Sequence, residues 1–421
     1  MVVISHPTGN INVREAALAL LEKHLLDEFH TCIAACGGNI FEKLAALPGL
    51  AQIKRRTCFN ALSPYLRLDP WREIGRLFAE RLGIGLLTQL ESAIFSIDAV
   101  YRSFDGNVAK QIALNDNISA VYCYEDGAWE TFLAAKKKGL KCIYEHPVGY
   151  WRKVHEISLE ESQIQPAWSQ ALPSLKDSQE KLHRKDDELQ LADHIIVPSS
   201  YSRSSLQNCP FQLAPISVVP YGMPRTAHFP KKVHFNKKGK LKVIFVGGLN
   251  QLKGISYLFD AIHLLESAVQ LTIIGRKTTN HCKKLNDTLE NHRWIPSLPH
   301  DQILSEMRNH DVLVLPSLSD GFGMVITEAL SQGIPVITTQ HTCGPDIITD
   351  DVNGFIVPIR SAEAIAEKLE KLHINKSKLL EMRLEATSKA EKFTWSTYRQ
   401  SVSTVVDSIL QFPKSKSASI T

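Results

Sequence analysis

Short apolar runs alternate with longer amphipathic stretches along this chain of 421 residues, and the alternation runs through it twice. In the first half, "ISAVYCY" and "LKCIYEH" have the length and apolar content of buried strands, and "GAWETFLAAKKKG" between them has helical spacing. The strands expected there are residues 2–5, 118–124, 140–146, 192–200 and 216–222, and the helices include 13–26 and 127–139. This alternation predicts a parallel sheet with helices on both faces.

A polar, basic segment at residues 221–240, which contains "MPRTAHFPKKVHFNKKGK", interrupts the pattern and is predicted to be a linker. The alternation then starts afresh, with strands expected at 241–248, 269–276, 311–317 and 335–339 and helices at 254–266, 299–310, 324–333 and 362–373. The chain also exceeds the roughly 250–300 residues at which single cores stop growing. We therefore expect two α/β domains facing each other across a cleft, where the carboxyl ends of both sheets bind ligands.

The composition excludes several classes of protein. Hydrophobic residues make up 44% of the chain and charged residues 22%, which is typical of a soluble globular protein. The net charge of +4 does not favour nucleic acid as a partner. The eight cysteines form no zinc-binding pattern, and we find neither an export signal nor a run of 18 apolar residues, so that a cytoplasmic location is expected.

Residues 50–85 form a basic segment with seven Lys and Arg against three Asp and Glu, and with Phe59, Tyr65 and Trp71 interleaved. One interpretation is peripheral contact with an anionic membrane at its inner face, or with an anionic acceptor. The interpretation that we favour is a solvated helical face with an irregular insertion.

The stretch "SDGFGMVITEALSQGIPVI" follows a predicted strand and places Asp320 and Glu328 around a glycine-rich turn. Gly321 and Gly323 allow the backbone to approach a ligand closely. The helix expected from Met324 directs its first free N–H groups into the cleft, where they favour a phosphate. A phosphate site between two carboxylates suggests a nucleotide sugar, although the two acids also raise glycoside hydrolysis as an alternative.

Two cations are expected at the same edge of the second sheet. Lys253 lies in the loop "FVGGLNQLKG" after the first strand of the second half, and Arg276 follows another strand in "LTIIGRK". A lysine is well suited to neutralise a departing diphosphate. With these groups present, the chemistry requires no metal, and none is predicted.

Several further polar residues stand near strand ends or on helices. His6 precedes "PTGN" and Asp126 ends a strand in "YEDGAW", so that both are candidates for the cleft. The adjacent acids Asp186, Asp187 and Glu188 point in different directions on a helix, and we expect them to form a solvated face rather than a metal site.

The motifs of the second half resemble a known family. "LPSLSDGFGMVITEALSQGIPVI" closely resembles the signature of the retaining glycosyltransferases of family 4 (glycosyl transferases group 1), which have the GT-B fold. "FVGGLNQLKGISYLFDA" is similar to the donor-phosphate loop of that family, and "ISVVPYGM" to the end of its first domain. "ADHIIVPSSYS", "VNGFIVP" and "FTWSTY" match further elements. The resemblance is strong over residues 190–400 and looser before them.

The resemblance implies two Rossmann-like domains and a C-terminal helix that crosses back to the first. The divisions expected are residues 1–220 for the acceptor-side domain, 221–240 for the linker, 241–392 for the donor domain, 393–412 for the returning helix and 413–421 for a disordered tail.

Site residues follow from the same resemblance, position by position. It assigns Glu328 to the nucleotide ribose, Asp320 to the donor sugar, Lys253 to the leaving diphosphate and His146 to the transferred sugar. Gly9 and Asn10 match the glycine loop that approaches donor and acceptor. The resemblance places Phe322, Gly323, Met324 and Val325 around the sugar and the phosphates. Gly247, Gly248 and Gly321 in the same loops, and the cation Arg276 identified above, are also expected to bind the donor. Two positions depart from the family pattern: Asp320 stands where glutamate is usual, and Gly248 where many members have arginine.

The function expected is retaining transfer of a hexose-type sugar from a nucleotide-diphosphate sugar to a glycan, lipid-linked or small-molecule hydroxyl, in polysaccharide biosynthesis. The nucleotide sugar is a co-substrate, and no cofactor or metal is expected. The alternatives are glycoside hydrolysis, a nucleotide-sugar epimerase of the same architecture, and a nucleotide-sugar-binding protein that has lost catalysis.

Overall fold

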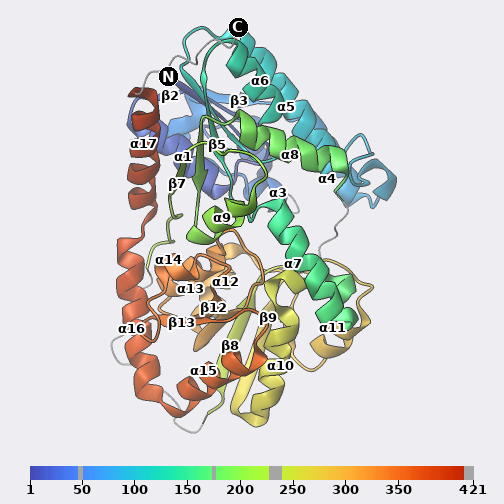
Figure 1. Ribbon diagram of the computed structural model, residues 1–421, viewed down its shortest axis with the longest axis vertical. Helices are drawn as coiled ribbons and strands as arrows, with labels where there is room; N and C mark the ends of the chain where they lie inside the picture. Colours follow the sequence, from blue (N-terminus) through green and yellow to red (C-terminus); the bar gives the residue numbers. More distant parts are fainter. Residues whose placement is uncertain (46–50, 173–176, 227–238, 412–421) are drawn as a thin grey trace.

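The computed structural model describes residues 1–45, 51–172, 177–226 and 239–411. Figure 1 shows two α/β lobes, one built from the first half of the chain and one from the second. Most of the predicted linker and the predicted tail at 413–421 lie outside the described residues. None of the described helices combines the length and apolar character needed to cross a bilayer.

The first lobe contains a seven-stranded parallel sheet in the order β3-β2-β1-β4-β5-β6-β7. Its strands are β1 Val2–Ser5, β2 Leu26–Thr31, β3 Leu66–Leu68, β4 Ala120–Tyr124, β5 Lys141–Glu145, β6 His194–Val197 and β7 Ile216–Val218. Its helices are α1 Ile11–Glu22, α2 Ile40–Ala45, α3 Ala51–Lys54, α4 Trp71–Arg81, α5 Ile97–Leu114, α6 Trp129–Lys137, α7 Trp151–Ile164, α8 Gln179–Leu191 and α9 Ser200–Ser205.

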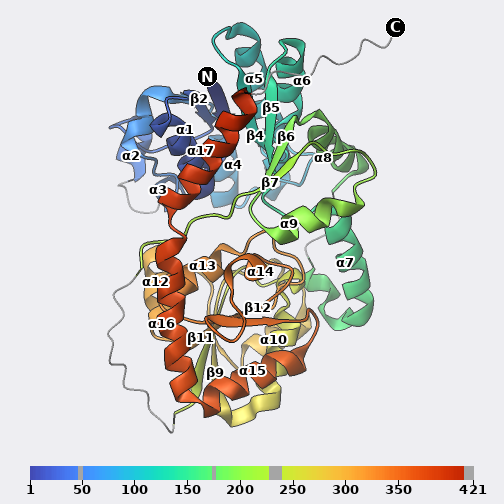
Figure 2. The ribbon, with the colours of Figure 1, turned by 60° about the vertical axis from the view of Figure 1, so that its left-hand side comes forward.

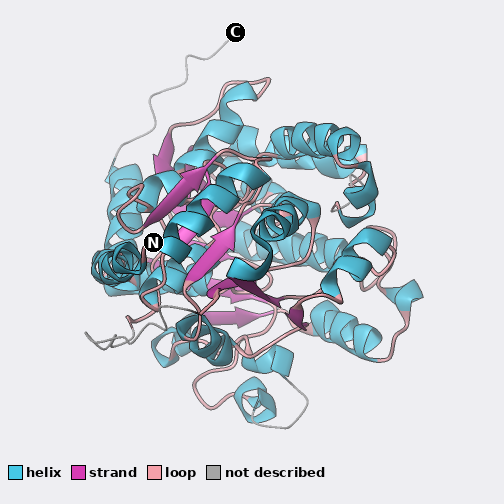
Figure 3. Cartoon of the chain, turned by 90° about the horizontal axis from the view of Figure 1, so that it is seen from below, coloured by secondary structure: helices cyan, strands magenta, loops and turns pink. Residues whose placement is uncertain are grey.

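The second lobe contains a six-stranded parallel sheet in the order β10-β9-β8-β11-β12-β13. Its strands are β8 Leu241–Val246, β9 Val269–Ile274, β10 Arg293–Ile295, β11 Val312–Leu315, β12 Val336–Thr339 and β13 Gly354–Val357. Its helices are α10 Ile255–Leu265, α11 Lys283–Leu289, α12 His300–Arg308, α13 Met324–Ser331, α14 Gly344–Ile347, α15 Ala362–Ile374 and α16 Lys376–Lys392, and α17 Trp395–Gln411 ends the described chain. Figure 3 shows the strands inside a surround of helices.

The strand β2 was not predicted, and the helix predicted over 13–26 is too long. The helix α1 ends at Glu22, His24 takes a left-handed conformation with a φ of 58°, and β2 begins at Leu26. The reversal is stabilised by hydrogen bonds from Leu25 N to Leu20 O (2.8 Å) and from Val2 N to Leu25 O (2.7 Å). The sequence "LDEFHT" conceals the strand because polar residues interrupt its apolar pattern.

The segment 50–85, whose first residue lies outside the described chain, contains a helix with a largely unburied face, as we favoured, but the rest of it is not an irregular insertion. It contains α3, a 3-10 turn at Asn60–Tyr65, the strand β3 and the helix α4. The strand β3 pairs with β2, with Phe29 opposite Leu66, and so forms one edge of the first sheet. The segment is therefore an integral part of the first lobe.

The C-terminal helix crosses back to the first lobe as predicted, and Figure 2 shows α17 lying along it while α16 lies along the second. Arg399 on α17 forms ion pairs with Glu15 (2.6 Å) and Glu22 (3.1 Å) on α1. At the crossing, Met223 N donates to Phe393 O (2.7 Å). A Cβ on Gly222 would lie 2.5 Å from Cα of Trp395, so only glycine permits the two passages between the lobes to lie this close.

The helix α7 and the 3-10 turn after it, Pro166–Ala171, pack against the second lobe although they belong to the first half of the chain (Figure 1). Glu161 on α7 is fully buried and accepts hydrogen bonds from Gln251 Nε2 (2.8 Å), Tyr257 OH (2.8 Å) and Arg360 Nε (2.9 Å). The ring of Trp168 also stacks on that of Phe259 at 5.8 Å. The alternation of strands and helices did not predict this excursion.

Candidate functional site

The carboxyl ends of the two sheets carry most of the predicted site residues. In the first lobe, the loop 6–10 follows β1 and His146 follows β5. In the second lobe, Gly247 and Gly248 follow β8, Arg276 follows β9, and residues 317–323 follow β11. Parallel strands place these ends at one edge of each sheet.

Asp320 and Lys253 lie in contact, which the sequence did not predict. Lys253 Nζ forms an ion pair with Asp320 Oδ2, and both side chains are largely buried. The backbone of each residue is fixed independently, since Lys253 N donates to Asn250 Oδ1 (3.2 Å) and Asp320 N donates to His341 O (3.0 Å). The pair therefore joins the two loops that were assigned separately to phosphate and sugar.

Gly321 is the point where the first lobe touches this turn. A Cβ on Gly321 would lie 2.1 Å from Pro147 O, so that no larger residue fits without moving the two lobes apart. The carbonyl oxygen of Gly321 accepts hydrogen bonds from the hydroxyls of Ser199 and Ser202, the second at 2.9 Å. The loop before α13 is thus fixed by groups from both halves of the chain.

The helix α13 begins at Met324, directly after Gly323, as the sequence predicted. The side chains of Met324 and Val325 are half-buried, but that of Phe322 is 2% exposed and packs edge-on against Tyr221 at 4.9 Å. Phe322 is therefore placed to contribute backbone groups, rather than its ring, to a ligand.

Glu328 lies on the second turn of α13 and has a partner that sequence reasoning missed. His300 Nε2, at the start of α12, lies 2.9 Å from Glu328 Oε1. The hydrogen bond that His300 donates to Glu328 raises the pKa of His300. The only signal for this contact is that both residues stand on helices that follow strands of one sheet, at the same edge.

His6 determines the shape of the glycine loop in the first lobe. His6 Nδ1 accepts hydrogen bonds from Thr8 N (3.0 Å) and Gly9 N (3.2 Å). Burial lowers the pKa of His6 to about 3, so that its ring is neutral and Nδ1 stays available as an acceptor. Asn10 Oδ1 accepts from the Thr8 hydroxyl (3.0 Å). The sequence identified His6 as a cleft residue but not as the residue that holds Gly9.

His146 is the most unusual of the predicted residues. It is 1% exposed, and within the described chain neither of its ring nitrogens has a hydrogen-bond partner. Burial lowers its pKa, so that the ring is neutral. Burying polar atoms without partners costs free energy, and such atoms in a native protein call for an explanation. A ligand that donates to or accepts from this ring would supply one.

Glu145, next to His146, forms a buried hydrogen-bond network that the sequence did not indicate. Its carboxylate accepts from Tyr122 OH (2.5 Å), Tyr221 OH (2.5 Å) and Asn12 Nδ2 (3.2 Å). These partners come from β4, the chain after β7, and α1, so the network fixes the base of the His146 loop. In the sequence, this network is indicated only by one acidic residue at the end of an apolar strand.

The prediction of a solvated acidic face on α8 is wrong for two of its three residues. Asp187 is exposed, but Asp186 is 6% and Glu188 0% exposed. Asp186 accepts hydrogen bonds from Tyr150 OH (2.8 Å) and Trp151 Nε1 (2.7 Å). Glu188 accepts from the backbone N–H groups of residues 126, 128 and 129. Both carboxylates therefore fix loops that border the cleft.

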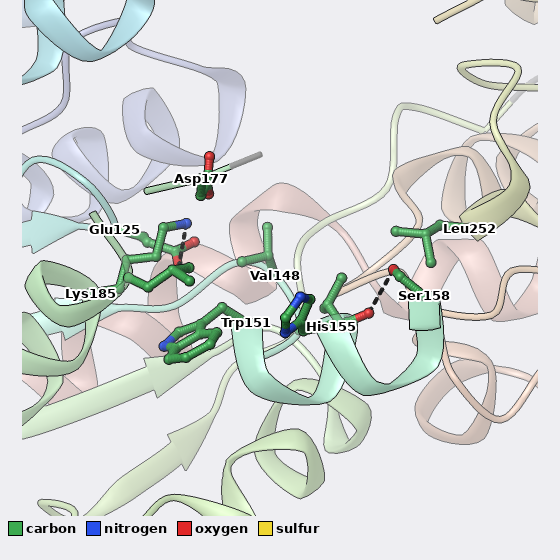
Figure 4. A pocket seen from close by; sticks show the side chains of 11 residues that line it. Glu125, Val148, Trp151, His155, Ser158, Asp177, Lys185 and Leu252 are labelled. Atoms are coloured by element: carbon green, nitrogen blue, oxygen red, sulfur yellow. Dashed lines mark hydrogen bonds and ion pairs between the residues drawn. The ribbon is translucent and has the colours of Figure 1, made fainter. Parts of the chain in front are cut away.

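A cavity of ≈ 270 Å³ lies between these loops, α7 and the second lobe, as Figure 4 shows. Lys185 stands on one wall, 3.2 Å from Glu125 Oε1 and 3.4 Å from Asp126 Oδ2. Trp151 lies on another wall, and Leu252 closes the cavity from the loop that carries Lys253. The walls of the cavity combine apolar side chains with a few charged and polar ones, which is typical of a site for a small molecule.

Gly248 stands at the position where an arginine was expected from the family pattern, and the space beside it is open. The nearest atom to a Cβ at Gly248 is Asn250 Nδ2, at 3.6 Å. Arg276 is close along the backbone, because Leu249 N donates to Arg276 O (2.9 Å), and Gly247 N donates to Ile274 O (3.0 Å). The side chain of Arg276, however, lines a separate cavity together with residues of the first lobe.

The sequence of the second lobe matches a known protein family. Residues 226–393 match the family described as "Glycosyl transferases group 1". The chain is 29% identical over 143 residues to an uncharacterized 41.2 kDa protein in the cps region of Klebsiella pneumoniae, covering 33% of this chain and 39% of that protein. It is 32% identical over 157 residues to the capsular polysaccharide biosynthesis glycosyltransferase CapM of Staphylococcus aureus, covering 36% and 41%. The match thus spans about two fifths of the length of these relatives.

Solved structures match the whole chain. Sucrose-phosphate synthase from Thermosynechococcus elongatus superposes with a TM-score of 0.64 at 13% identity, over 97% of this chain and 98% of that one. Anabaena Alr3699/HepE in complex with UDP superposes with a TM-score of 0.61 at 14% identity, over 97% and 99%. These similarities confirm the predicted fold, with two Rossmann-like lobes in the GT-B arrangement.

Proposed function

We propose that this protein transfers a sugar from a nucleotide-diphosphate sugar to an acceptor hydroxyl with retention of configuration, because residues 226–393 match the glycosyl transferases group 1 family. The observation that carries the proposal is the contact between Lys253 and Asp320. It places one cation and one carboxylate side by side at the amino end of α13, where a diphosphate and a sugar would meet.

The proposed chemistry begins with the donor displacing part of this ion pair. The diphosphate takes the ammonium of Lys253 as its partner, and the carboxylate of Asp320 then accepts hydrogen bonds from sugar hydroxyls. Lys253 and the first N–H groups of α13 stabilise the charge that develops as the leaving group departs, without a metal. The acceptor hydroxyl attacks from the face that the diphosphate leaves and gives its proton to the departing diphosphate oxygen, so that no carboxylate nucleophile is needed.

The remaining assignments concern the ends of the donor. Glu328, held by His300 at 2.9 Å, is proposed to bind the ribose hydroxyls. The unpartnered ring of His146 is proposed to bind the transferred sugar near its reacting carbon. Gly9 and Asn10 are proposed to border donor and acceptor. The UDP complex of a structural neighbour makes UDP-sugars the first donors to test, and the name of the relative CapM supports polysaccharide synthesis as the process.

Hydrolysis by Asp320 and Glu328 is disfavoured by the partners of the two carboxylates. Asp320 contacts Lys253, whereas Glu328 contacts His300 on another helix. A hydrolase would instead orient both carboxyl groups toward one glycosidic bond. An epimerase and a binding protein without activity use the same donor contacts, and only product analysis separates them from a transferase.

The test is a turnover assay with a panel of UDP-, GDP- and ADP-sugars, each with and without a panel of glycan and lipid-linked acceptors. A transferase releases nucleotide and forms a new glycosidic bond only when donor and acceptor are both present. Conversion of the donor sugar without an acceptor would identify an epimerase. Binding of a donor with no turnover on any acceptor would contradict catalysis altogether.

A further inference from the structure

A second cavity, of ≈ 580 Å³, lies between the first lobe and Arg276 of the second. Its walls are mostly apolar side chains from the loop after β2, from α2 and from α4, among them Ile33, Phe41, Leu77 and Phe78. For comparison, an engineered apolar cavity of about 150 Å³ stays dry and binds benzene. The cavity beside α4 therefore has room for a longer apolar group.

The surface next to this cavity is also apolar. Six side chains between α4 and the start of α5 are exposed by 42% to 84%, and we call them the α4 surface: Trp71, Phe78, Leu82, Leu86, Leu90 and Ile94. Phe78 belongs to both the α4 surface and the cavity wall. Figure 1 places α4 at the outer edge of the first lobe. Exposed apolar side chains concentrated in this way mark interaction sites.

Three of the seven basic residues in the segment 50–85 have acidic partners in the first lobe. Arg76 forms ion pairs with Glu73 (2.6 Å) and Glu80 (2.5 Å), Arg56 forms one with Glu73, and Arg67 forms one with Glu28 (2.8 Å). These pairs reduce the attraction of the segment to an anionic surface, and the exposed side chains of the α4 surface offer hydrophobic contact beside the exposed Lys54, Arg55 and Arg81.

The cavity is connected to the candidate donor site through Arg276. The carbonyl of Arg276 accepts a hydrogen bond from Leu249 N (2.9 Å), in the loop that continues to Lys253. The apolar walls, together with Glu80 and Arg81, belong to the first lobe, and Arg276 belongs to the second, so a molecule in the cavity lies between the lobes. A protein bound to the α4 surface alone would have no need of a cavity that reaches the cleft.

We propose that the cavity beside α4 binds the hydrocarbon chain of a lipid-linked acceptor, while the α4 surface contacts the bilayer that carries it. The chain lies among Ile33, Phe41 and Leu77, and the polar head of the lipid lies toward Arg276 and the loop of Lys253. This inference rests on the proposed function, because it identifies the class of its acceptor.

Binding of n-alkyl phosphates with 4 to 12 carbons, kept below micelle formation, tests the cavity by calorimetry. The dissociation constant should fall about fourfold for each added CH₂ until the cavity is filled. Phe78→Ser, at an exposed position, should weaken the longest chain at least fivefold and the shortest hardly at all. Ile374→Ser, which removes a side chain that is 74% exposed on the second lobe, is the matched control and should leave every constant unchanged.

Affinity that does not depend on chain length, or a dependence that Phe78→Ser leaves unaltered, would overturn the proposal. A dimer in solution that Phe78→Ser dissociates would also overturn it, since a second copy would then cover the α4 surface. Binding to neutral phosphatidylcholine vesicles that persists in high salt would support it, and binding only to anionic vesicles that salt abolishes would not. UDP binding, measured separately, distinguishes failure of this inference from failure of the proposed function.

Discussion

The two sides of the cleft hold their polar groups in different electrostatic states. The second lobe presents charges in pairs, Lys253 with Asp320 and Glu328 with His300. The first lobe presents the buried rings of His6 and His146, and burial lowers the pKa of both so that they are neutral. The two charged pairs can therefore exchange ionic partners, whereas the two histidine rings can offer only hydrogen bonds.

This difference fits the parts of a nucleotide sugar. A diphosphate carries charge and needs a cation that can leave its present partner, which the pair of Lys253 and Asp320 supplies. A sugar is neutral and is recognised by hydrogen bonds. A neutral histidine beside it adds no positive charge that would compete with Lys253 for the diphosphate. The predictions below test each side of this comparison in turn.

The largest effect is expected when the charged side loses its cation. Lys253→Ala should lower kcat about a hundred- to a thousandfold, as loss of one preorganised stabilising group does in other enzymes. Initial rates at saturating donor measure the effect. Lys371→Ala, which removes a lysine that is 2.8 Å from Asp351 on the surface, is the control and should retain kcat. Full activity in Lys253→Ala would remove the proposed leaving-group role.

A larger residue at Gly321 should move the first lobe away from the second. In Gly321→Ala the new Cβ would lie 2.1 Å from Pro147 O and 2.4 Å from Val148 Cα, so that the lobes must move apart. Misplacement of reacting groups by about 1 Å can cost a hundredfold in rate, and we expect kcat/KM to fall by about that factor. Small-angle scattering should show a larger radius of gyration.

The control for Gly321→Ala is Gly106→Ala on α5, where an added Cβ meets no atom within 4 Å. This substitution should leave both the rate and the radius of gyration as they are in the unmodified protein. If Gly321→Ala also left the rate and the radius of gyration unchanged, the contact between the lobes would not position the site.

The neutral side is tested by His146→Phe. This substitution removes two ring nitrogens that have no partner in the described chain, so the melting temperature should not fall. The loss of a hydrogen bond to the sugar should lower kcat/KM about tenfold or more. Calorimetry and steady-state kinetics on the same sample measure both. A drop in stability with unchanged kinetics would show that His146 is structural.

The smallest effect is expected at His300, and its sign follows from the pKa. The hydrogen bond to Glu328 raises the folded-state pKa of His300, so the pair stabilises the fold fully below the ordinary value of about 6.5. This contribution disappears as the pH rises through the raised pKa. The melting temperature of His300→Gln should therefore fall below that of the unmodified protein at pH 6 and approach it at pH 8. A difference that grew with pH would contradict the assignment.

Sequence predicted most strands of the two sheets and missed β2, β3, β10 and β13, which lie at or next to the sheet edges. The run "LKVIFV" becomes β8 as expected, because a strand covered by helices on both sides is apolar throughout. The strand β2 carries the polar residues Asp27, Glu28 and His30, which interrupt its apolar pattern and hide it in the sequence. In the structure, Glu28 forms pairs with His30 and Arg67. Edge and near-edge strands thus depend on side-chain pairs that one sequence does not reveal.

The candidate site shows the same limit. Topology alone places Lys253, Asp320 and His146 at strand ends, because the order of strands and helices fixes where the loops lie. It does not reveal which distant groups meet, such as Glu328 with His300 or Glu188 with the backbone after β4. The roles assigned to these residues toward a ligand stay predictions until the variants are measured.

The burial of Glu161 has a consequence for biosynthesis. Its partners Gln251, Tyr257 and Arg360 follow it in the chain by 90, 96 and 199 residues. At a synthesis rate of about 5–20 residues per second, Arg360 is made roughly 10–40 s after Glu161. During that time α7 stays exposed on the nascent chain with an uncompensated charge. The docking of α7 against the second lobe therefore becomes one of the last steps in the maturation of the protein on the ribosome.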